Sequence, residues 1–301
     1  MHPETIRYSS RWLIPLSFAI IYIVWGSTYL ANWYVIQDIP PMITTGSRYL
    51  MAGILLVALQ WRHGIPNVSA RQWRNAVVSG FMLLSVGTGC LVWAVQYIPS
   101  SLLALMVAFQ PLLVLLLMWS FYGKRPNTMG VMGTVLGIVG MFILVSQEQL
   151  VANEMGLPGM AAVLVSLLSW GVASVRMARL DMPASGFLSS GIQMMVGGSL
   201  LLLVAVPFGE YRHLTLDTIA SRSLYAWLYL VVFGSVAAFS AFNYLLKVST
   251  PEKVASASYI NPVVAMLLGW GLNQEQISLQ SLVSSLFLLS GVFIINTNYR
   301  K

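Results

Sequence analysis

The chain has 301 residues, of which 57% are hydrophobic and only 8% are charged. A soluble domain carries about 25% charged residues, so this composition argues against a cytosolic enzyme, a nucleic-acid-binding protein and a disordered chain. The single cysteine, Cys90, excludes an intrachain disulfide and a metal site built from several cysteines. The 16 basic residues outnumber the 9 acidic ones, but they lie in short gaps between long apolar runs, which is typical of membrane proteins.

Apolar runs long enough to cross a bilayer, which takes roughly 20 residues, follow one another along the whole chain. In chain order they lie at residues 12–32, 42–61, 74–97, 100–122, 128–146, 157–179, 186–207, 224–246, 253–272 and 278–296. Stretches such as Leu112–Leu117 are continuously apolar, whereas a membrane β-barrel would alternate. The sequence therefore predicts an all-α integral membrane protein of ten helices, with the first run retained rather than cleaved as a signal peptide.

The basic residues predict the orientation of these helices. If the N-terminus is cytoplasmic, thirteen of the 16 basic residues fall in cytoplasmic segments. Only Arg212 and Arg222 then lie in outer loops, and Arg48 lies within the second run. An excess of Lys and Arg on the cytoplasmic side is the positive-inside pattern. It predicts a multi-pass protein of the inner (plasma) membrane with both termini in the cytoplasm.

The two halves of the chain resemble each other weakly. Trp25-Gly26 recurs as Trp170-Gly171, and Gln110-Pro111 lines up with Asn261-Pro262. Because each half holds five spans, the halves have opposite topology, a common plan of secondary transporters that bind substrate between them near the midplane. The predicted organisation is a cytoplasmic N-terminus at 1–11, a first five-helix repeat at 12–146, an outer linker at 147–156, a second five-helix repeat at 157–296 and a cytoplasmic C-terminus at 297–301.

Several short motifs in this order resemble the EamA-like drug/metabolite transporter family. They are Trp25-Gly26-Ser27-Thr28, Arg48, Pro111, the stretch Ala255–Pro262 and Glu275. The resemblance covers nearly the whole chain, and within the family it is strongest to the YddG-type amino-acid exporters. It implies ten helices, two inverted halves around a central cavity, and movement of small metabolites, often export of amino acids. One departure is Gly123-Lys124, where family members often carry Gly-Glu, so that the acid remains only as Glu275.

Aromatic and amide side chains near midspan are candidates for the cavity wall. Arg48 joins them because a guanidinium fork matches a carboxylate. The predicted substrate-binding residues are Tyr22, Trp25, Tyr29, Arg48, Trp93, Gln96, Trp170, Gln193, Asn243, Tyr259 and Asn261. The alternative is that the aromatics pack the core and the membrane interfaces, and that Arg48 is structural. Pro111 and Pro262 are predicted either as hinges for alternating access or as static kinks that shape the cavity.

The absence of certain residues from the spans narrows the function further. No acid or histidine lies inside a span, so the usual proton relay is not visible, and no Walker motif indicates ATP. The predicted function is a secondary transporter that exports small polar metabolites, principally amino acids, or a passive facilitator. A nucleotide-sugar would call for several intramembrane basic residues, and a cationic drug or an intramembrane enzyme for buried acids. No cofactor, metal or nucleic acid is expected, and the partners are a small-molecule substrate and the lipid bilayer.

Overall fold

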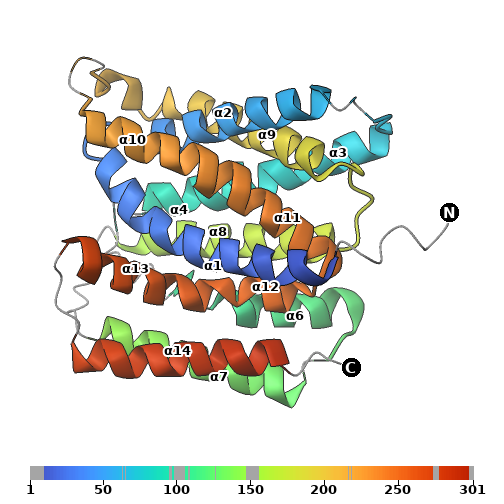
Figure 1. The fold of residues 1–301 in the computed structure, drawn as a ribbon, viewed down its shortest axis with the longest axis vertical. Coiled ribbons are helices and arrows are strands. Elements are labelled where there is room, and N and C mark those ends of the chain that lie inside the picture. Colours follow the sequence, from blue (N-terminus) through green and yellow to red (C-terminus); the bar gives the residue numbers. More distant parts are fainter. Residues whose placement is uncertain are drawn as a thin grey trace.

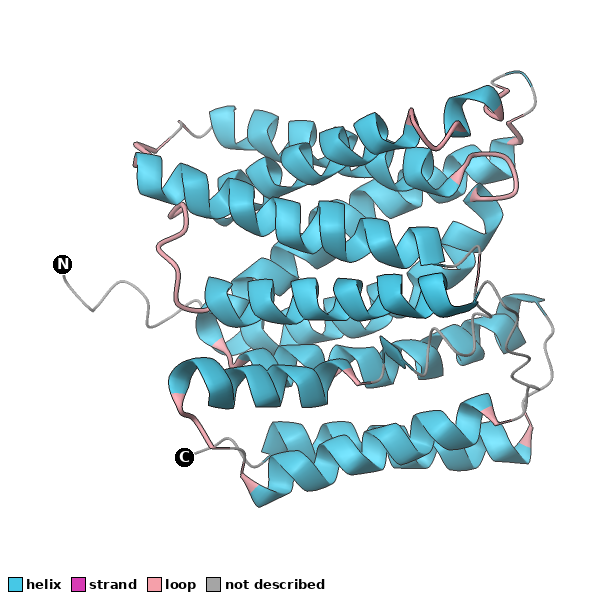
Figure 2. Cartoon of the chain, turned by 180° about the vertical axis from the view of Figure 1, so that it is seen from behind, coloured by secondary structure: helices cyan, strands magenta, loops and turns pink. Residues whose placement is uncertain are grey.

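The computed structural model describes residues 10–62, 64, 66–94, 97, 106–107, 109–125, 127–146, 156–215, 217, 219–273 and 278–297. Within these residues the chain is helical and contains no strand, which confirms the all-α prediction (Figures 1 and 2). Seven of the described helical segments are long and apolar enough to cross a membrane: Trp12–Val35, Pro41–Arg62, Ala70–Ala94, Leu157–Met177, Gly186–Ala205, Ser221–Val248 and Pro251–Leu272. Three shorter apolar helices, Gln110–Tyr122, Thr128–Ile143 and Leu279–Ile295, lie within the other predicted runs.

The helices follow the predicted runs closely, but two of the runs change helix type midway. The helices of the first half are α1 (Ser10–Val35), α2 (Pro41–Arg62), α3 (Ala70–Gly80), the π-helix η2 (Phe81–Thr88), α4 (Gly89–Ala94), α6 (Gln110–Tyr122) and α7 (Thr128–Val145). Those of the second half are α8 (Gly156–Met177), α9 (Gly186–Ala205), the 3₁₀ turn η3 (Glu210–Arg212), α10 (Ser221–Tyr229), the π-helix η5 (Leu230–Ala237), α11 (Ala238–Val248), α12 (Pro251–Ala255), α13 (Ala257–Asn273) and α14 (Leu279–Thr297). Each π-helix continues directly from one α-helix into the next.

Local sequence signals set several of these helix ends. Ser69 and Gln72 form a capping box at the start of α3, and the Ser185 side chain accepts from the third amide of α9. Gly123 ends α6 in a left-handed conformation with φ of 64°, which glycine adopts without steric cost. These signals place the connections between helices at the predicted gaps.

The helices lie roughly parallel or antiparallel to one another in one bundle. The start of α1 and the end of α14 lie at the same end of it, on the right in Figure 1, and we call this the terminal end. The tightest helix pairs are α2 with α9 at one edge and α7 with α14 at the opposite edge. Helix α1 lies between these edges and packs against α10, α11 and α13. The largest buried hydrophobic cluster joins α1, α2, α3, α8, α9 and α11, so most of the core lies between the two halves of the chain.

Glycines allow α2 and α9 to approach until their backbones touch. Gly46 on α2 faces Gly198 on α9, and Gly53 on α2 faces Gly191 on α9. Within each helix the two glycines are seven residues apart. A Cβ on Gly198 would lie 2.7 Å from the Gly46 carbonyl oxygen, and one on Gly53 would lie 2.7 Å from the Met195 backbone nitrogen. Small residues permit this kind of close packing between helices in lipid, where the hydrophobic effect does not hold helices together.

Carboxylates fasten the loops at the end of the bundle opposite the terminal end. The buried carboxylate of Glu210 accepts hydrogen bonds from the Met42 and Ile43 amides, at 3.1 and 2.9 Å, and so satisfies donors in the first turn of α2. Asp38, in the loop between α1 and α2, accepts from the Ser223 hydroxyl at 2.6 Å and from the Ala220 amide at 3.0 Å. Glu210 of the second half thus binds the start of α2, and Asp38 of the first half binds the start of α10.

Stability at acid pH should depend on Asp38. The hydrogen bond from Ser223, then that from the Ala220 amide, and then the charge of Arg222 hold the pKa of Asp38 below its usual 3.8. A carboxyl with a lowered folded-state pKa contributes stability that is present above the unfolded pKa and is lost as pH falls through the folded pKa. We therefore expect Asp38→Asn to flatten the fall of melting temperature below about pH 4, measured on purified protein between pH 3 and 7. Identical pH profiles for wild type and variant would contradict this expectation.

Candidate functional site

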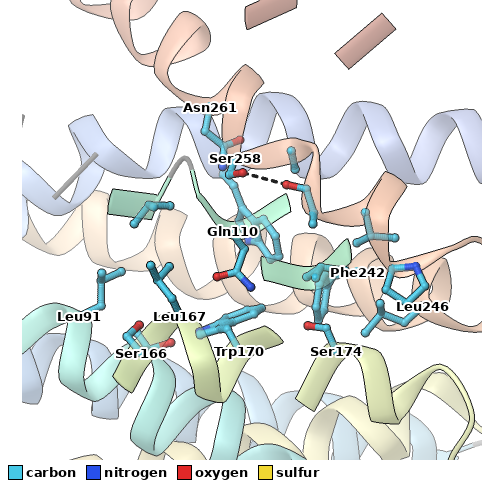
Figure 3. Close-up of a pocket in the computed structure, with 18 residues that line it drawn as sticks. Leu91, Gln110, Ser166, Leu167, Trp170, Ser174, Phe242, Leu246, Ser258 and Asn261 are labelled. Atoms are coloured by element: carbon cyan, nitrogen blue, oxygen red, sulfur yellow. Dashed lines mark hydrogen bonds between the residues drawn. The ribbon is translucent and has the colours of Figure 1, made fainter. Parts of the chain in front are cut away.

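A cavity of about 180 Å³ opens between helices that come from both halves of the chain (Figure 3). Its wall is mainly apolar, and none of the described residues that line it carries a charge. The polar groups are amides and hydroxyls from α6, α8, α13 and the end of η2. They belong to Thr88, Gln110, Ser166, Ser174, Ser258 and Asn261. Concave, mostly apolar sites with a few placed polar groups are the usual form of small-molecule sites.

Three aromatic rings in the lining of this cavity contact one another. Trp25 of α1 and Trp170 of α8 meet edge to face, with ring centroids 6.2 Å apart and planes at 90°. Phe242 of α11 contacts both, at 5.4 Å from Trp25 and 5.3 Å from Trp170. Aromatic rings prefer such offset and edge-to-face contacts, so the three rings hold one another in place.

Each tryptophan is also held by a π-helix of the opposite half. The Trp25 indole N–H donates to the Gly234 carbonyl of η5 at 3.3 Å. The Trp170 indole rests against Gly87 of η2, where a Cβ would overlap the ring, and the neighbouring Ser169 hydroxyl donates to the Met82 carbonyl at 2.6 Å. π-helices are rare and occur frequently at functional sites. Sequence reasoning missed both of them, and the only available signal was a glycine in the middle of each predicted span.

Two amides face the cavity from equivalent positions of the two halves. Gln110 is the first residue of α6 and Asn261 lies in α13, and each comes directly before a proline. Gln110 Oε1 and Asn261 Oδ1 are both buried without a hydrogen-bond partner. Buried polar atoms in folded proteins are nearly always paired, so these two oxygens are sites at which a donor is needed.

The prolines that follow these amides are not equivalent. Pro111 stands in the first turn of α6, where a proline removes no helix hydrogen bond. Pro262 lies inside α13, and the helix break of the second half falls six residues earlier, between α12 and α13 at Ser256. The expectation that both prolines interrupt a helix interior therefore fits Pro262 and not Pro111. Their role as hinges stays a prediction.

Of the predicted substrate-binding residues, Trp25, Trp170 and Asn261 line the cavity. Three others are buried in contacts between helices, away from the cavity wall. Gln193 binds Ser189 at 3.1 Å, Asn243 donates to Ser190 at 2.7 Å, and the Tyr259 hydroxyl donates to a backbone carbonyl of α7 at 3.2 Å. In this conformation Asn243 and Tyr259 join helices to one another, whereas the Gln193 hydrogen bond lies within α9.

The remaining aromatic candidates, Tyr22, Tyr29 and Trp93, do not line the cavity. The Tyr22 hydroxyl hydrogen-bonds to Ser256 at 3.3 Å, at the break between α12 and α13. Tyr29 is 47% exposed, and Trp93 stacks on Tyr97 with centroids 4.5 Å apart. Neither Tyr29 nor Trp93 lines the cavity. Gln96 lies outside the described residues.

Arg48 does not line the cavity but is connected to its wall. Its guanidinium donates to Asn32 Oδ1 at 3.4 Å and to the Tyr49 hydroxyl at 3.1 Å. The Tyr49 hydroxyl in turn lies 3.5 Å from the Thr88 hydroxyl, and Thr88 is a lining residue. Through these contacts Arg48 positions one polar group of the wall, and its direct contact with a carboxylate stays a prediction.

Lys124 has an acidic partner from the other half of the chain. Its ammonium lies 3.2 Å from Glu252 Oε1, which joins the end of α6 to the first turn of α12 at the terminal end. The Glu252 side chain is only 3% exposed, whereas that of Lys124 is 39% exposed. This pairing gives a physical reason for a lysine after Gly123. Glu275, the acid expected from the family pattern, lies outside the described residues.

The two partners of this ion pair should differ in their effect on stability. Lys124→Ala leaves a buried carboxylate without its cation. We expect the free energy of unfolding to fall by about 1–3 kcal/mol, which lies between the values for exposed and fully buried ion pairs. Glu252→Gln leaves an ammonium that solvent reaches, and we expect the free energy of unfolding to fall by less than about 1 kcal/mol. Denaturant unfolding of purified variants measures both values. Equal losses would show that burial of Glu252 does not control the pair.

Comparison with known proteins identifies the family. The sequence matches the EamA-like transporter family twice, at residues 12–146 and 157–297. It is 34% identical over 272 residues to the uncharacterized inner membrane transporter YedA of Escherichia coli (strain K12), with 89% of this chain and 86% of YedA covered. It is 27% identical over 274 residues to protein PecM of Dickeya dadantii (strain 3937), covering 90% and 88% of the two chains.

The fold is also found among solved structures. One crystal structure of a protein superposes with a TM-score of 0.80 at 19% identity, covering 95% of this chain and 97% of the other. The family matches fill both halves of the chain, and the described helices include seven able to cross a membrane. This chain is therefore a multi-pass membrane protein that belongs to the EamA-like transporter family.

Proposed function

We propose that this transporter exports small zwitterionic metabolites, principally amino acids, across the inner membrane by alternating access. The observation that carries the proposal is the cavity between the two halves, with its three aromatic rings, neutral amides and hydroxyls, and uncharged wall. A solute with zero net charge suits such a wall because a net charge in an apolar site is unfavourable without a partner. An amino acid at neutral pH has zero net charge and groups that accept and donate hydrogen bonds.

The size and charge of the cavity favour this cargo over the rival ones. Pockets for drug-sized ligands span roughly 300–1,000 Å³, and this cavity of about 180 Å³ suits a smaller solute. A nucleotide-sugar would require cations in the wall to balance its phosphates, and a cationic drug would require an acid. Neither kind of residue is found among the described lining residues.

The proposed layout is ten transmembrane helices in two inverted five-helix repeats. Three relations between the halves support it. The family matches twice, the tight pairs α2–α9 and α7–α14 each join corresponding helices, and a π-helix occupies the corresponding span of each half. In alternating access, such repeats move against each other around a site at their interface. Trp25 and Trp170, each held by a π-helix of the other half, lie at that interface.

The proposed orientation has both termini in the cytoplasm, as the distribution of basic residues predicts. Reporter fusions test it directly. A reporter after Arg300 should be active on the cytoplasmic side, and one after Glu148 on the outer side. A C-terminus found outside would contradict both the orientation and the inverted repeat.

Uptake of radiolabelled amino acids into proteoliposomes tests the function. We expect saturable uptake above that of protein-free liposomes, and faster uptake when the vesicles are preloaded with unlabelled amino acid. A pH gradient of either sign separates coupled transport, in which uptake changes with the gradient, from facilitated passage, in which it does not. If no amino acid enters faster than in protein-free vesicles while the protein is folded and inserted, the proposed function is wrong.

A further inference from the structure

We infer that Glu252 binds a proton during the transport cycle, and that this proton releases Lys124 and so unfastens α6 from the second half of the chain at the terminal end. The inference rests on the proposed function in one respect, namely that the protein opens and closes around the cavity. It adds the ion that controls the opening and the group that binds this ion.

Glu252 is a buried acid whose charge has one ionic partner. Its side chain is 3% exposed, and its Oε1 lies 3.2 Å from the Lys124 ammonium. Within the described residues its other oxygen, Oε2, is buried and has no hydrogen-bond partner. A buried carboxylate is stable only when its charge is paired and its remaining lone pairs are satisfied, so Glu252 depends on Lys124. Its position just before the span predicted at 253–272 gave no sign of this burial.

Glu210, the other acid that is buried among the described residues, is held differently. Each of its oxygens accepts from a backbone amide, one of Met42 and one of Ile43, and these donors are fixed in the first turn of α2. The ammonium that holds Glu252 belongs instead to a side chain that is 39% exposed. Since solvent reaches this ammonium, a proton from water can compete with it for the Glu252 carboxylate.

The small cavity beside Glu252 suits a neutral carboxyl. Apart from Glu252, the described residues that line it are Pro111, Leu115, Gly130, Thr134 and Ile295. The Thr134 hydroxyl is the one polar side-chain group of this lining, and it is also buried without a partner. A group in such surroundings is favoured when it is neutral over when it carries a charge that has lost its partner. Glu252 can therefore stay buried without Lys124 when it carries a proton.

The neighbouring helices offer little that could replace Lys124. Helix α12 packs against α6, α11, α13 and α14, and the sequences of α7, α13 and α14 contain no charged residue. Lys247 of α11 donates to the Pro183 carbonyl at 3.2 Å. When water gives a proton to the carboxylate, Lys124 keeps its ammonium, the net charge of the pair rises from zero to +1, and their attraction is lost. The other titratable groups on α12 and these neighbours, or at their ends, are Tyr122, Arg125, Tyr244, Lys253 and Tyr259.

The ion pair belongs to a set of contacts between the cavity and the terminal end. On α6, Val114 lines the cavity, and Met118 and Tyr122 follow at successive turns toward the terminal end. Val114 and Met118 pack against Val175 of α8 in a buried cluster. Arg179 Cζ lies 3.7 Å from the centre of the Tyr122 ring. All these contacts join α6 to the second half, so loss of the ion pair loosens the part of the protein that separates the cavity from the terminal end.

The accessibility of Val175 tests the inference on the full-length protein in lipid nanodiscs. Val175 is fully buried, and in a Cys90→Ala background Val175→Cys carries the single thiol of the chain. Its rate of labelling by a water-soluble maleimide is divided by the rate for the unfolded protein at the same pH, because the thiolate fraction itself changes with pH. We expect this ratio to rise about fivefold as the pH falls from about 8 to about 4.5, the scale of a partly exposed ion pair. Added Glu252→Gln should make the ratio high at every pH, because glutamine binds no proton.

Glu210→Gln is the matched control, since Glu210 is also a buried acid and lies at the opposite end of the bundle. In the same background its labelling ratio should follow that of Val175→Cys alone at every pH. Glu252→Asp keeps a carboxyl that can bind a proton, so the rise at low pH should remain. This variant also decides the matter if Glu252→Gln fails to fold, because loss of the rise in Glu252→Asp would then count against the inference.

Leucine uptake into proteoliposomes, with equal pH on both sides, connects the site to transport. The initial rate should change with pH in wild type and in Glu210→Gln, and this change should be absent in Glu252→Gln. The inference is wrong if labelling does not rise at low pH, if the rise persists in Glu252→Gln, or if uptake does not depend on pH in wild type. If labelling behaves as expected but no amino acid is transported, the proposed function fails, while Glu252 still controls the opening at the terminal end.

Discussion

Trp170→Ala is expected to weaken cargo binding by about 1.5 kcal/mol, or roughly tenfold in affinity, while the protein still inserts in the membrane. The indole forms part of the cavity wall and contacts both Trp25 and Phe242. Its loss removes an aromatic surface for the cargo and loosens the two rings that remain. Initial rates of amino-acid uptake into proteoliposomes, at equal amounts of inserted protein, measure the effect.

A pair of glycine variants tests the same wall without removing the ring. A Cβ at Gly87 would overlap the Trp170 indole, whereas a Cβ at Gly234, the glycine of η5, would lie 3.1 Å from Thr28 Cγ2. Gly87→Ala should therefore impair transport nearly as much as Trp170→Ala, and Gly234→Ala much less. Trp61→Ala, at a tryptophan that is 73% exposed on α2, should leave transport unchanged. Normal transport by both Trp170→Ala and Gly87→Ala would assign Trp170 to packing alone.

Gly198→Leu is expected to destabilise the protein by more than about 3 kcal/mol, beyond the usual range for overpacked side chains. The reason is that its neighbours on α2 are backbone atoms of Gly46 and Leu50, which cannot rotate away as a side chain would. The helices α2 and α9 must separate to admit the new side chain, and the packing that holds them together is lost along the whole contact. Because the free energy of unfolding of a native protein is about 5–15 kcal/mol, a destabilisation of this size removes a large part of it.

The matched control lies on the same helix. Gly186 is in the first turn of α9, and a Cβ there meets no atom within 4 Å. Gly186→Leu should melt within a few degrees of wild type in the same detergent, whereas Gly198→Leu should melt far lower or fail to accumulate. Gly198→Ala should fall between the two. Equal melting temperatures for Gly198→Leu and Gly186→Leu would mean that the α2–α9 contact adds little to stability.

The internal repeat was the sequence feature that best predicted the residues of the candidate site. It singled out Trp25 and Trp170, which lie 6.2 Å apart at the cavity. The same repeat aligns Gln110 with Asn261, but only Asn261 was predicted as a substrate-binding residue, and both line the cavity. Residues without a counterpart in the repeat, such as Phe242, gave no signal. Pairing of positions between the halves was therefore more informative than residue type.

Helix periodicity was a weaker guide to the site. Tyr22, Trp25 and Tyr29 share one face of α1 by spacing, yet only Trp25 lines the cavity. Tyr22 contacts the break between α12 and α13, and Tyr29 is 47% exposed. Along a helix of this length, successive turns meet different neighbours, since α1 packs against α10, α11 and α13. One face of such a helix has several environments.

The sequence by itself determined that this chain is a helical membrane protein of the EamA-like family, because a span of apolar residues and a repeated motif are local properties. The tertiary structure decided which polar groups meet. A membrane helix is apolar on all sides, so its sequence lacks the contrast that marks the buried face of a soluble helix. Only packing placed Lys124 beside Glu252, set Tyr259 between helices and Asn261 at the cavity, and let π-helices hold the two tryptophans. These contacts join residues more than 80 positions apart, and no local pattern in the chain specifies them.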